Sequence, residues 1–247
     1  MPAWPECSAL PLWWLPLACA AIPFLATHLA WWLSLREGFV PECLPYLEGC
    51  TSISRAARHG LGNHLFRLLM LPCALLQLLF WWSCRAWIAG AAPGQRARAA
   101  AVALTGTGAG LALAVYATFL GTEGQAYEWM RRYGINFYFG LGFIAQLLVI
   151  GALPALGFGS GIRRGAVVLS LGMLLLGLGN LVARYTVPER ELRDAIENAL
   201  EWNLGLLLTG WFLLAAWLFA RAGLALALQA PTAAGAGVRP SARSTSE

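Results

Sequence analysis

Long apolar runs alternate with short polar segments along the chain, and six of these runs are long enough to cross a bilayer. A transmembrane helix needs about 20 predominantly apolar residues, because each residue adds about 1.5 Å and the hydrocarbon core is about 30 Å thick. We therefore predict an all-α polytopic membrane protein with one six-helix transmembrane bundle over residues 1–222. The predicted spans are approximately residues 10–35, 65–84, 99–120, 134–157, 165–183 and 202–221.

Three local patterns refine this outline. Residues 188–202 begin with proline and acidic residues and carry an apolar stripe at helical spacing, which predicts an amphipathic helix that runs into the sixth span. Gly106 and Gly110 form a GxxxG pair, which predicts close packing against a neighbouring helix. Residues 223–247 end in Pro, Ala, Gly and Ser, and we expect them to form a disordered C-terminal tail.

The composition excludes an ordinary water-soluble fold. Of the 247 residues, 59% are hydrophobic and only 12% are charged, whereas soluble domains carry about 25% charged residues. Twelve tryptophans suit a chain that crosses the membrane interface repeatedly, because indole rings favour the headgroup zone. The expected location is therefore an integral, multi-pass membrane position, in the plasma (inner) membrane if the source is a bacterium.

The charge pattern bears on partners and orientation. All 17 basic residues are arginines, and the net charge is +5. The exclusive use of arginine would suit phosphate recognition, but codon bias in a GC-rich genome is the favoured explanation for it. No basic stripe with interleaved aromatics is present, so no nucleic acid partner is expected. The short turns at residues 85–98 and 163–164 carry five arginines and no acid, and the positive-inside rule therefore places both termini in the cytoplasm.

The densest polar segment, residues 50–67, lies between the first two spans and is the predicted functional site. An even number of crossings would bring it to the same membrane surface as the acidic start of the sixth span. Arginines beside a bilayer can hold lipid phosphates, so membrane lipids are the expected partners. The candidate headgroup-binding residues are Ser52, Ser54, Arg55, Arg58, His59, His64, Arg67, Glu197, Glu201 and Trp202.

Other interpretations of this segment stay open. It could be a solvated loop whose arginines meet ordinary lipid phosphates. It could also belong to a lipid-remodelling acyltransferase or hydrolase, in which Ser52 or Ser54 is the nucleophile and His59 or His64 the base. The spacing does not enforce that geometry, and the catalytic residues are unknown. Histidines five residues apart lack the register of a helical zinc pair, so neither a metal nor a cofactor is expected.

Polar residues inside the spans suggest a third class, a small-molecule transporter. These residues are His28, Gln77, Gln146 and Asn180. An intramembrane ionisable residue is a candidate for function, although a neutral histidine bonded to a neighbouring helix is the favoured interpretation of His28. Transporters usually show broken helices or inverted repeats, and neither is evident. Separately, Cys43 and Cys50 share one polar loop and could form a disulfide in an oxidising compartment.

The order of the polar motifs resembles the DRAM / FGF-receptor-activating-protein superfamily of six-helix membrane proteins, which includes GPI-anchor lipid remodelling proteins. The resemblance covers roughly residues 10–222. The motifs that carry it are Ser52-Ile53-Ser54, Leu65-Phe66-Arg67, Arg132-Tyr133-Gly134-Ile135-Asn136-Phe137, Ala195-Ile196 and Glu201-Trp202.

This resemblance implies six helices, cytoplasmic termini and a role in GPI lipid remodelling, phospholipid homeostasis or autophagy regulation. The family's chemistry is not settled, so no catalytic residue carries over to this chain. A histidine that often precedes the fourth helix is replaced here by Arg131 or Arg132, which weakens an acid–base role at that position. In a bacterium without GPI anchors, the substrate cannot be GPI itself.

Overall fold

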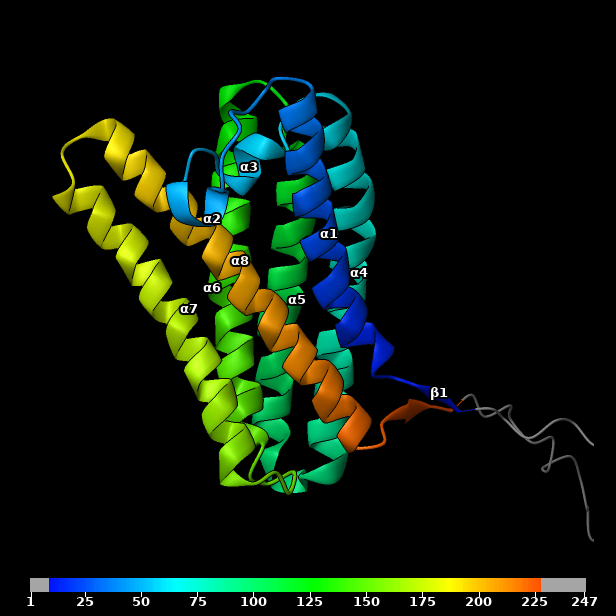
Figure 1. Ribbon diagram of the computed structural model, residues 1–247. Coiled ribbons are helices and arrows are strands. Elements are labelled where there is room, and N and C mark those ends of the chain that lie inside the picture. Colours follow the sequence, from blue (N-terminus) through cyan, green and yellow to red (C-terminus); the bar gives the residue numbers. More distant parts are fainter. Residues whose placement is uncertain (1–8, 228–247) are drawn as a thin grey trace, which may run out of the picture.

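The computed structural model describes residues 9–227, and six long helices dominate this part of the chain (Figure 1). Their bounds are α1 (Trp14–Arg36), α4 (Gly60–Ala91), α5 (Arg96–Phe119), α6 (Gln125–Ala152), α7 (Ser160–Thr186) and α8 (Arg190–Arg221). All six are long and apolar enough to cross a membrane. The predicted all-α, six-helix membrane bundle is confirmed.

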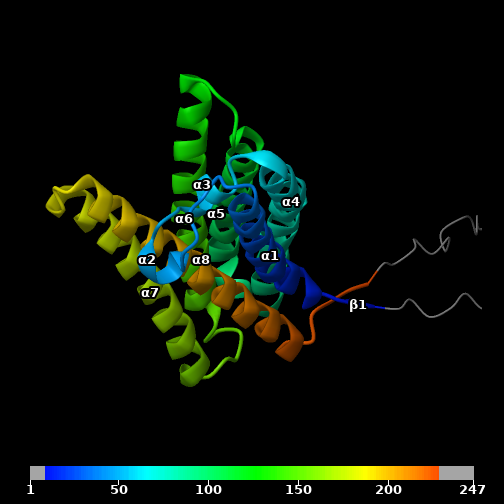
Figure 2. The ribbon, with the colours of Figure 1, turned by 45° about the horizontal axis from the view of Figure 1, so that its top comes forward.

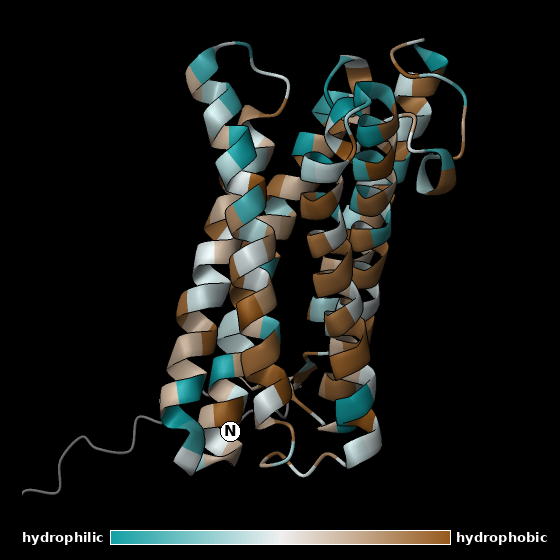
Figure 3. Cartoon of the chain, turned by 90° about the vertical axis from the view of Figure 1, so that its left-hand side faces the viewer, coloured by the Kyte–Doolittle hydropathy of each residue, from teal (hydrophilic) through white to brown (hydrophobic). Residues whose placement is uncertain are grey.

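Short elements fill the connections. Helices α2 (Pro45–Glu48) and α3 (Ile53–Ala56) lie in the loop between α1 and α4, and a 3₁₀ turn, η1 (Pro93–Gln95), precedes α5. This loop lies at the same end of the bundle as the α5–α6 and α7–α8 connections (Figure 1). We call this end, which carries residues 37–59, 120–124 and 187–189, the capped end. Hydrophobic residues fill the middle of the bundle, and hydrophilic residues gather towards its ends (Figure 3).

Most helices extend beyond the predicted spans. Helix α4 has 32 residues, which corresponds to about 48 Å and exceeds the hydrocarbon core. Helix α6 begins at Gln125 rather than at residue 134. Helix α8 begins at Arg190 and continues unbroken to Arg221, which confirms the predicted amphipathic helix that runs into the sixth span. Hydropathy detects only the part of a helix that lies in hydrocarbon, whereas the backbone hydrogen bonds continue into the interface.

Two predicted spans end differently for local reasons. Helix α6 stops at Ala152 instead of residue 157, because Pro154 cannot donate a backbone hydrogen bond. The first span starts at Trp14, since Leu10–Pro11 forms the short strand β1 and pairs with β2 (Ala225–Leu226). The start of the predicted disordered tail is therefore a strand, while residues 228–247 lie outside the described residues.

The core is built by close approach of α4 and α5 and by aromatic packing. A Cβ at Gly106 would overlap the Trp81 side chain, so the GxxxG prediction of close helix packing is confirmed. Trp81 also packs beside Phe80 and Trp211, with ring centroids 4.8 and 5.6 Å away. Helices α7 and α8 diverge from the α4–α5–α6 group towards the capped end (Figure 2). This divergence leaves the space in which the α1–α4 loop sits.

Candidate functional site

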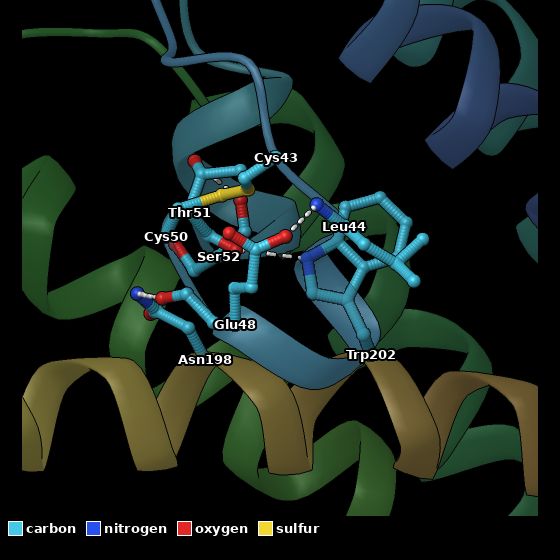
Figure 4. Close-up of a disulfide and its surroundings, with 9 residues drawn as sticks. Cys43, Leu44, Glu48, Cys50, Thr51, Ser52, Asn198 and Trp202 are labelled. Carbon is cyan, nitrogen blue, oxygen red and sulfur yellow. Dashed lines mark hydrogen bonds between the residues drawn. A yellow bond between two sulfur atoms is a disulfide. The ribbon is translucent and has the colours of Figure 1, made fainter.

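The loop between α1 and α4 is fastened to α8 at the capped end (Figure 4). Three α8 side chains donate hydrogen bonds to loop carbonyls: Asn198 to Gly49 (2.7 Å), Trp202 to Thr51 (2.9 Å) and Asn203 to Tyr46 (3.0 Å). Asn198 and Trp202 are four residues apart and therefore lie on one face of α8, and Asn203 follows Trp202 directly. The first loop and the start of α8 are therefore in direct contact.

A disulfide and a glycine shape this loop. Cys43 and Cys50 form a disulfide, which the sequence left open. Gly49 adopts a left-handed backbone conformation with φ of +62°, and a Cβ there would overlap the carbonyl oxygen of Ala195. Gly49 thus allows the loop to lie directly on the backbone of α8.

A polar pocket of about 430 Å³ opens between α3, α5 and α6. It is lined by Ser54, Arg58, Tyr116, Glu128, Arg131, Arg132 and Ile135. Arg131 donates hydrogen bonds to the carbonyls of Phe119 and Thr122, which holds its guanidinium group at the pocket. Three arginines against one glutamate make the pocket a site for an anion.

Arg58 lines this pocket with an incompletely bonded guanidinium group. Its Nε atom is buried and has no hydrogen-bond partner among the described residues. Burial and the nearby charges of Arg131 and Arg55 lower the pKa of Arg58 from its ordinary value, although an arginine side chain stays protonated in proteins. An anion in the pocket would offset this charge repulsion and supply acceptors. By contrast, Arg132 and Glu128 form an exposed pair at 3.6 Å, which contributes only about 0–1 kcal/mol.

An apolar cavity of about 70 Å³ adjoins this polar pocket, and Tyr116 and Ile135 line both. Its walls come from α1, α4, α5, α6 and α8 and include Met70, Leu113, Phe139 and Phe212. A smaller void of about 10 Å³ beside Gln77 and Gln146 shares the walls at Tyr138 and Phe212. A series of hollows therefore runs from the arginines at the capped end towards the middle of the bundle.

His28 lies on this cavity and is hydrogen-bonded through both ring nitrogens. Its Nδ1 is 2.6 Å from the carbonyl oxygen of Phe24, which can only accept, so Nδ1 donates. Its Nε2 is 2.8 Å from the Tyr46 hydroxyl, within hydrogen-bond distance. The partner of His28 outside its own helix is therefore a loop residue from α2. The prediction that His28 bonds to a neighbouring element agrees with this geometry.

Glu201 also lines the apolar cavity. The backbone N–H groups of Ser54 and Ile53 at the start of α3 lie near its carboxylate and favour its charged form. Within residues 9–227, Glu201 has no salt-bridge partner. A carboxylate thus faces an apolar space with backbone donors and no directly paired cation.

The structure brings four of the ten predicted site residues to these hollows: Ser54 and Arg58 at the polar pocket, and Glu201 and Trp202 at the apolar cavity. Ser52 lines neither hollow. Its hydroxyl caps the start of α3 by accepting a hydrogen bond from the backbone N–H of Arg55 at 3.1 Å.

The other predicted residues lie apart from the hollows. Arg55 and His64 are exposed, and Arg67 lies on α4 outside the lining of both hollows. His59 stacks on Phe39 with ring centroids 5.3 Å apart. Glu197 pairs with Arg184 on α7 at 3.3 Å.

The serine–histidine pairing considered from the sequence does not form. The Ser52 and Ser54 hydroxyls are 3.2 Å apart and bond to each other. Among residues 9–227, no hydrogen bond joins either serine to His59 or His64.

Sequence reasoning missed Tyr46, Tyr116 and Arg131 as site residues. Tyr46 lies in a loop, where no sequence pattern marks it as a site residue. Tyr116 lies inside an apolar span and looks like a core residue. The segment holding Glu128, Arg131 and Ile135 has helical spacing that continues into the fourth span, and this periodicity could have identified Arg131.

Comparison of the chain with protein-family models, curated proteins and solved structures gives no match. The class of the protein therefore rests on its fold, which is that of an all-α, multi-pass membrane protein with six candidate spans. Its membership of the DRAM / FGF-receptor-activating-protein superfamily stays a prediction.

Proposed function

We propose that this protein binds one membrane phospholipid at the capped end and takes part in lipid homeostasis or remodelling. The phosphate would lie in the polar pocket between Arg58 and Arg131, and an acyl chain would enter the adjoining cavity. The observation that carries the proposal is that the two hollows share Tyr116 and Ile135. A ligand that joins an anionic group to a hydrocarbon chain matches the polar pocket with one end and the apolar cavity with the other.

The length of the hollows supports this assignment. Arg131 at the polar pocket and Gln146 at the inner void are 15 residues apart on α6, which corresponds to about 22 Å of helix. One leaflet contributes about half of the 30 Å hydrocarbon core. The residues that line the hollows are therefore spread over a depth at least as great as one leaflet of the hydrocarbon core.

The Cys43–Cys50 disulfide supports an extracytoplasmic position for the capped end, because disulfides persist in oxidising compartments. The arginines in the turns at the opposite end, residues 85–98 and 163–164, favour the same orientation by the positive-inside rule. Both termini would then be cytoplasmic, and the site would serve the outer leaflet. This orientation is part of the proposal.

Lipid retention by variants tests the proposal. The protein would be purified in mild detergent, and co-purified phospholipid would be quantified by mass spectrometry. A hydrogen bond to a charged group is worth about 1.5–3 kcal/mol, so Arg58→Gln should lower retention by about 10-fold or more. Arg190→Gln is the matched control, because Arg190 is exposed at the same end and lines neither hollow. Equal retention by both variants, each folded, would contradict a phosphate site at Arg58.

A further inference from the structure

We propose that Glu201 and the aromatic rings beside it form a subsite for the ammonium group of a zwitterionic phospholipid. This inference rests on the proposed function and specifies its ligand class. It assigns the arginine pocket to the phosphate, the Glu201 end of the apolar cavity to the amine of the same headgroup, and the inner end of that cavity, at Met70 and Phe139, to the acyl chain.

The carboxyl group of Glu201 lacks an ion-pair partner within residues 9–227. A carboxylate beside an apolar cavity is costly unless it is paired with a cation. The two nearby backbone N–H groups can fill only part of its capacity, which is about four hydrogen bonds. Arg55 and Arg58 attract the carboxylate without forming an ion pair within residues 9–227. A cationic ligand would complete both the charge balance and the hydrogen bonding.

Aromatic side chains line the same cavity as this carboxyl group. Trp202, Tyr46 and Phe24 all line the cavity that Glu201 lines. Tyr46 and Trp202 have ring centroids 5.4 Å apart, and Phe24 lies 4.2 Å from the His28 ring. Aromatic faces attract ammonium groups, and several rings around one site are the usual way to bind a quaternary amine.

The two charged subsites lie next to each other. Tyr116 lines the arginine pocket and the Glu201 cavity alike. An anion subsite and a cation subsite therefore adjoin across a shared wall. In ethanolamine and choline phospholipids only two carbons separate the phosphate oxygen from the nitrogen, so adjoining subsites are what such a headgroup requires.

The test compares three lipids with identical acyl chains: phosphatidylethanolamine, phosphatidylcholine and phosphatidic acid, which lacks the amine. Each is added to delipidated protein in detergent, and bound lipid is counted by native mass spectrometry. We expect wild-type protein to retain at least one of the two amine lipids about 10-fold better than phosphatidic acid. Glu201→Gln should abolish this preference, while Glu197→Gln, altered at a residue that pairs with Arg184 outside the cavity, should keep it.

The outcomes separate this inference from the proposed function. Loss of all three lipids in Arg58→Gln together with an unchanged amine preference in Glu201→Gln would overturn the ammonium subsite and leave the phosphate site standing. Unchanged binding in Arg58→Gln with a lost preference in Glu201→Gln would overturn the phosphate site alone. Equal retention of all three lipids by wild-type protein would also overturn the ammonium subsite. Displacement of bound lipid by equimolar phosphoethanolamine would assign the subsites to a free solute and overturn the lipid assignment.

Discussion

Replacing Gly49 with alanine tests how the first loop is fastened to α8. Gly49 has φ of +62°, and a Cβ would overlap the backbone oxygen of Ala195. An alanine in the left-handed region costs about 1–2 kcal/mol by itself. The overlap is with backbone, which cannot rotate away, so the loop must lift from α8. Asn198 then loses its acceptor, and a buried donor without a partner costs a further 1–3 kcal/mol, roughly.

The expected loss for Gly49→Ala is therefore about 2–5 kcal/mol of unfolding free energy. Gly38→Ala is the matched control, because Gly38 has φ of +76° with no atom within 4 Å of its Cβ position. The control should lose only about 1–2 kcal/mol. Both values can be measured by SDS titration in mixed micelles with the disulfide intact. Equal losses in the two variants would refute the close approach of the loop to α8.

Two further substitutions test the packing and the cavity. Gly106→Ala should destabilise the bundle by about 1–3 kcal/mol, because the methyl group would overlap Trp81. The control Gly140→Ala, where a Cβ meets nothing within 4 Å, should be neutral or stabilising in the same SDS titration; equal losses would argue against tight α4–α5 packing. Tyr46→Phe should cost about 0.5–1.5 kcal/mol by removing the hydrogen bond to His28, and an unchanged His28 imidazole nitrogen NMR spectrum would contradict that bond.

The fold could be predicted from the sequence because the bilayer imposes a strong constraint. A span must satisfy its backbone internally, so an apolar run of sufficient length has few alternatives to a helix. The helix ends were less predictable. Residues 125–133 are polar and lie outside the predicted spans, yet they form the first turns of α6. Hydropathy reports the environment of a residue, whereas helix ends depend on local hydrogen bonding and on breakers such as Pro154.

The site was predictable only in part. Ser54, Arg58, Glu201 and Trp202 stood out because polar residues are rare in this chain, and the structure places them at the hollows. The residues that complete the hollows beside them did not stand out. The sequence of any one span does not determine which helix packs against the first loop. Tyr116 and Tyr138 read as core residues, because an aromatic residue inside an apolar run looks the same whether it faces a cavity or a neighbouring helix.

Photo-crosslinking with a phospholipid that carries a diazirine on its acyl chain tests the central claim most directly. The protein would be reconstituted with this lipid, irradiated and digested, and the labelled residues would be identified by mass spectrometry. We predict labels on cavity residues such as Met70 and Phe139, and their loss in Arg58→Gln. Labels confined to outward-facing residues such as Val168 and Leu178, with none in the cavity, would contradict a bound lipid at the capped end.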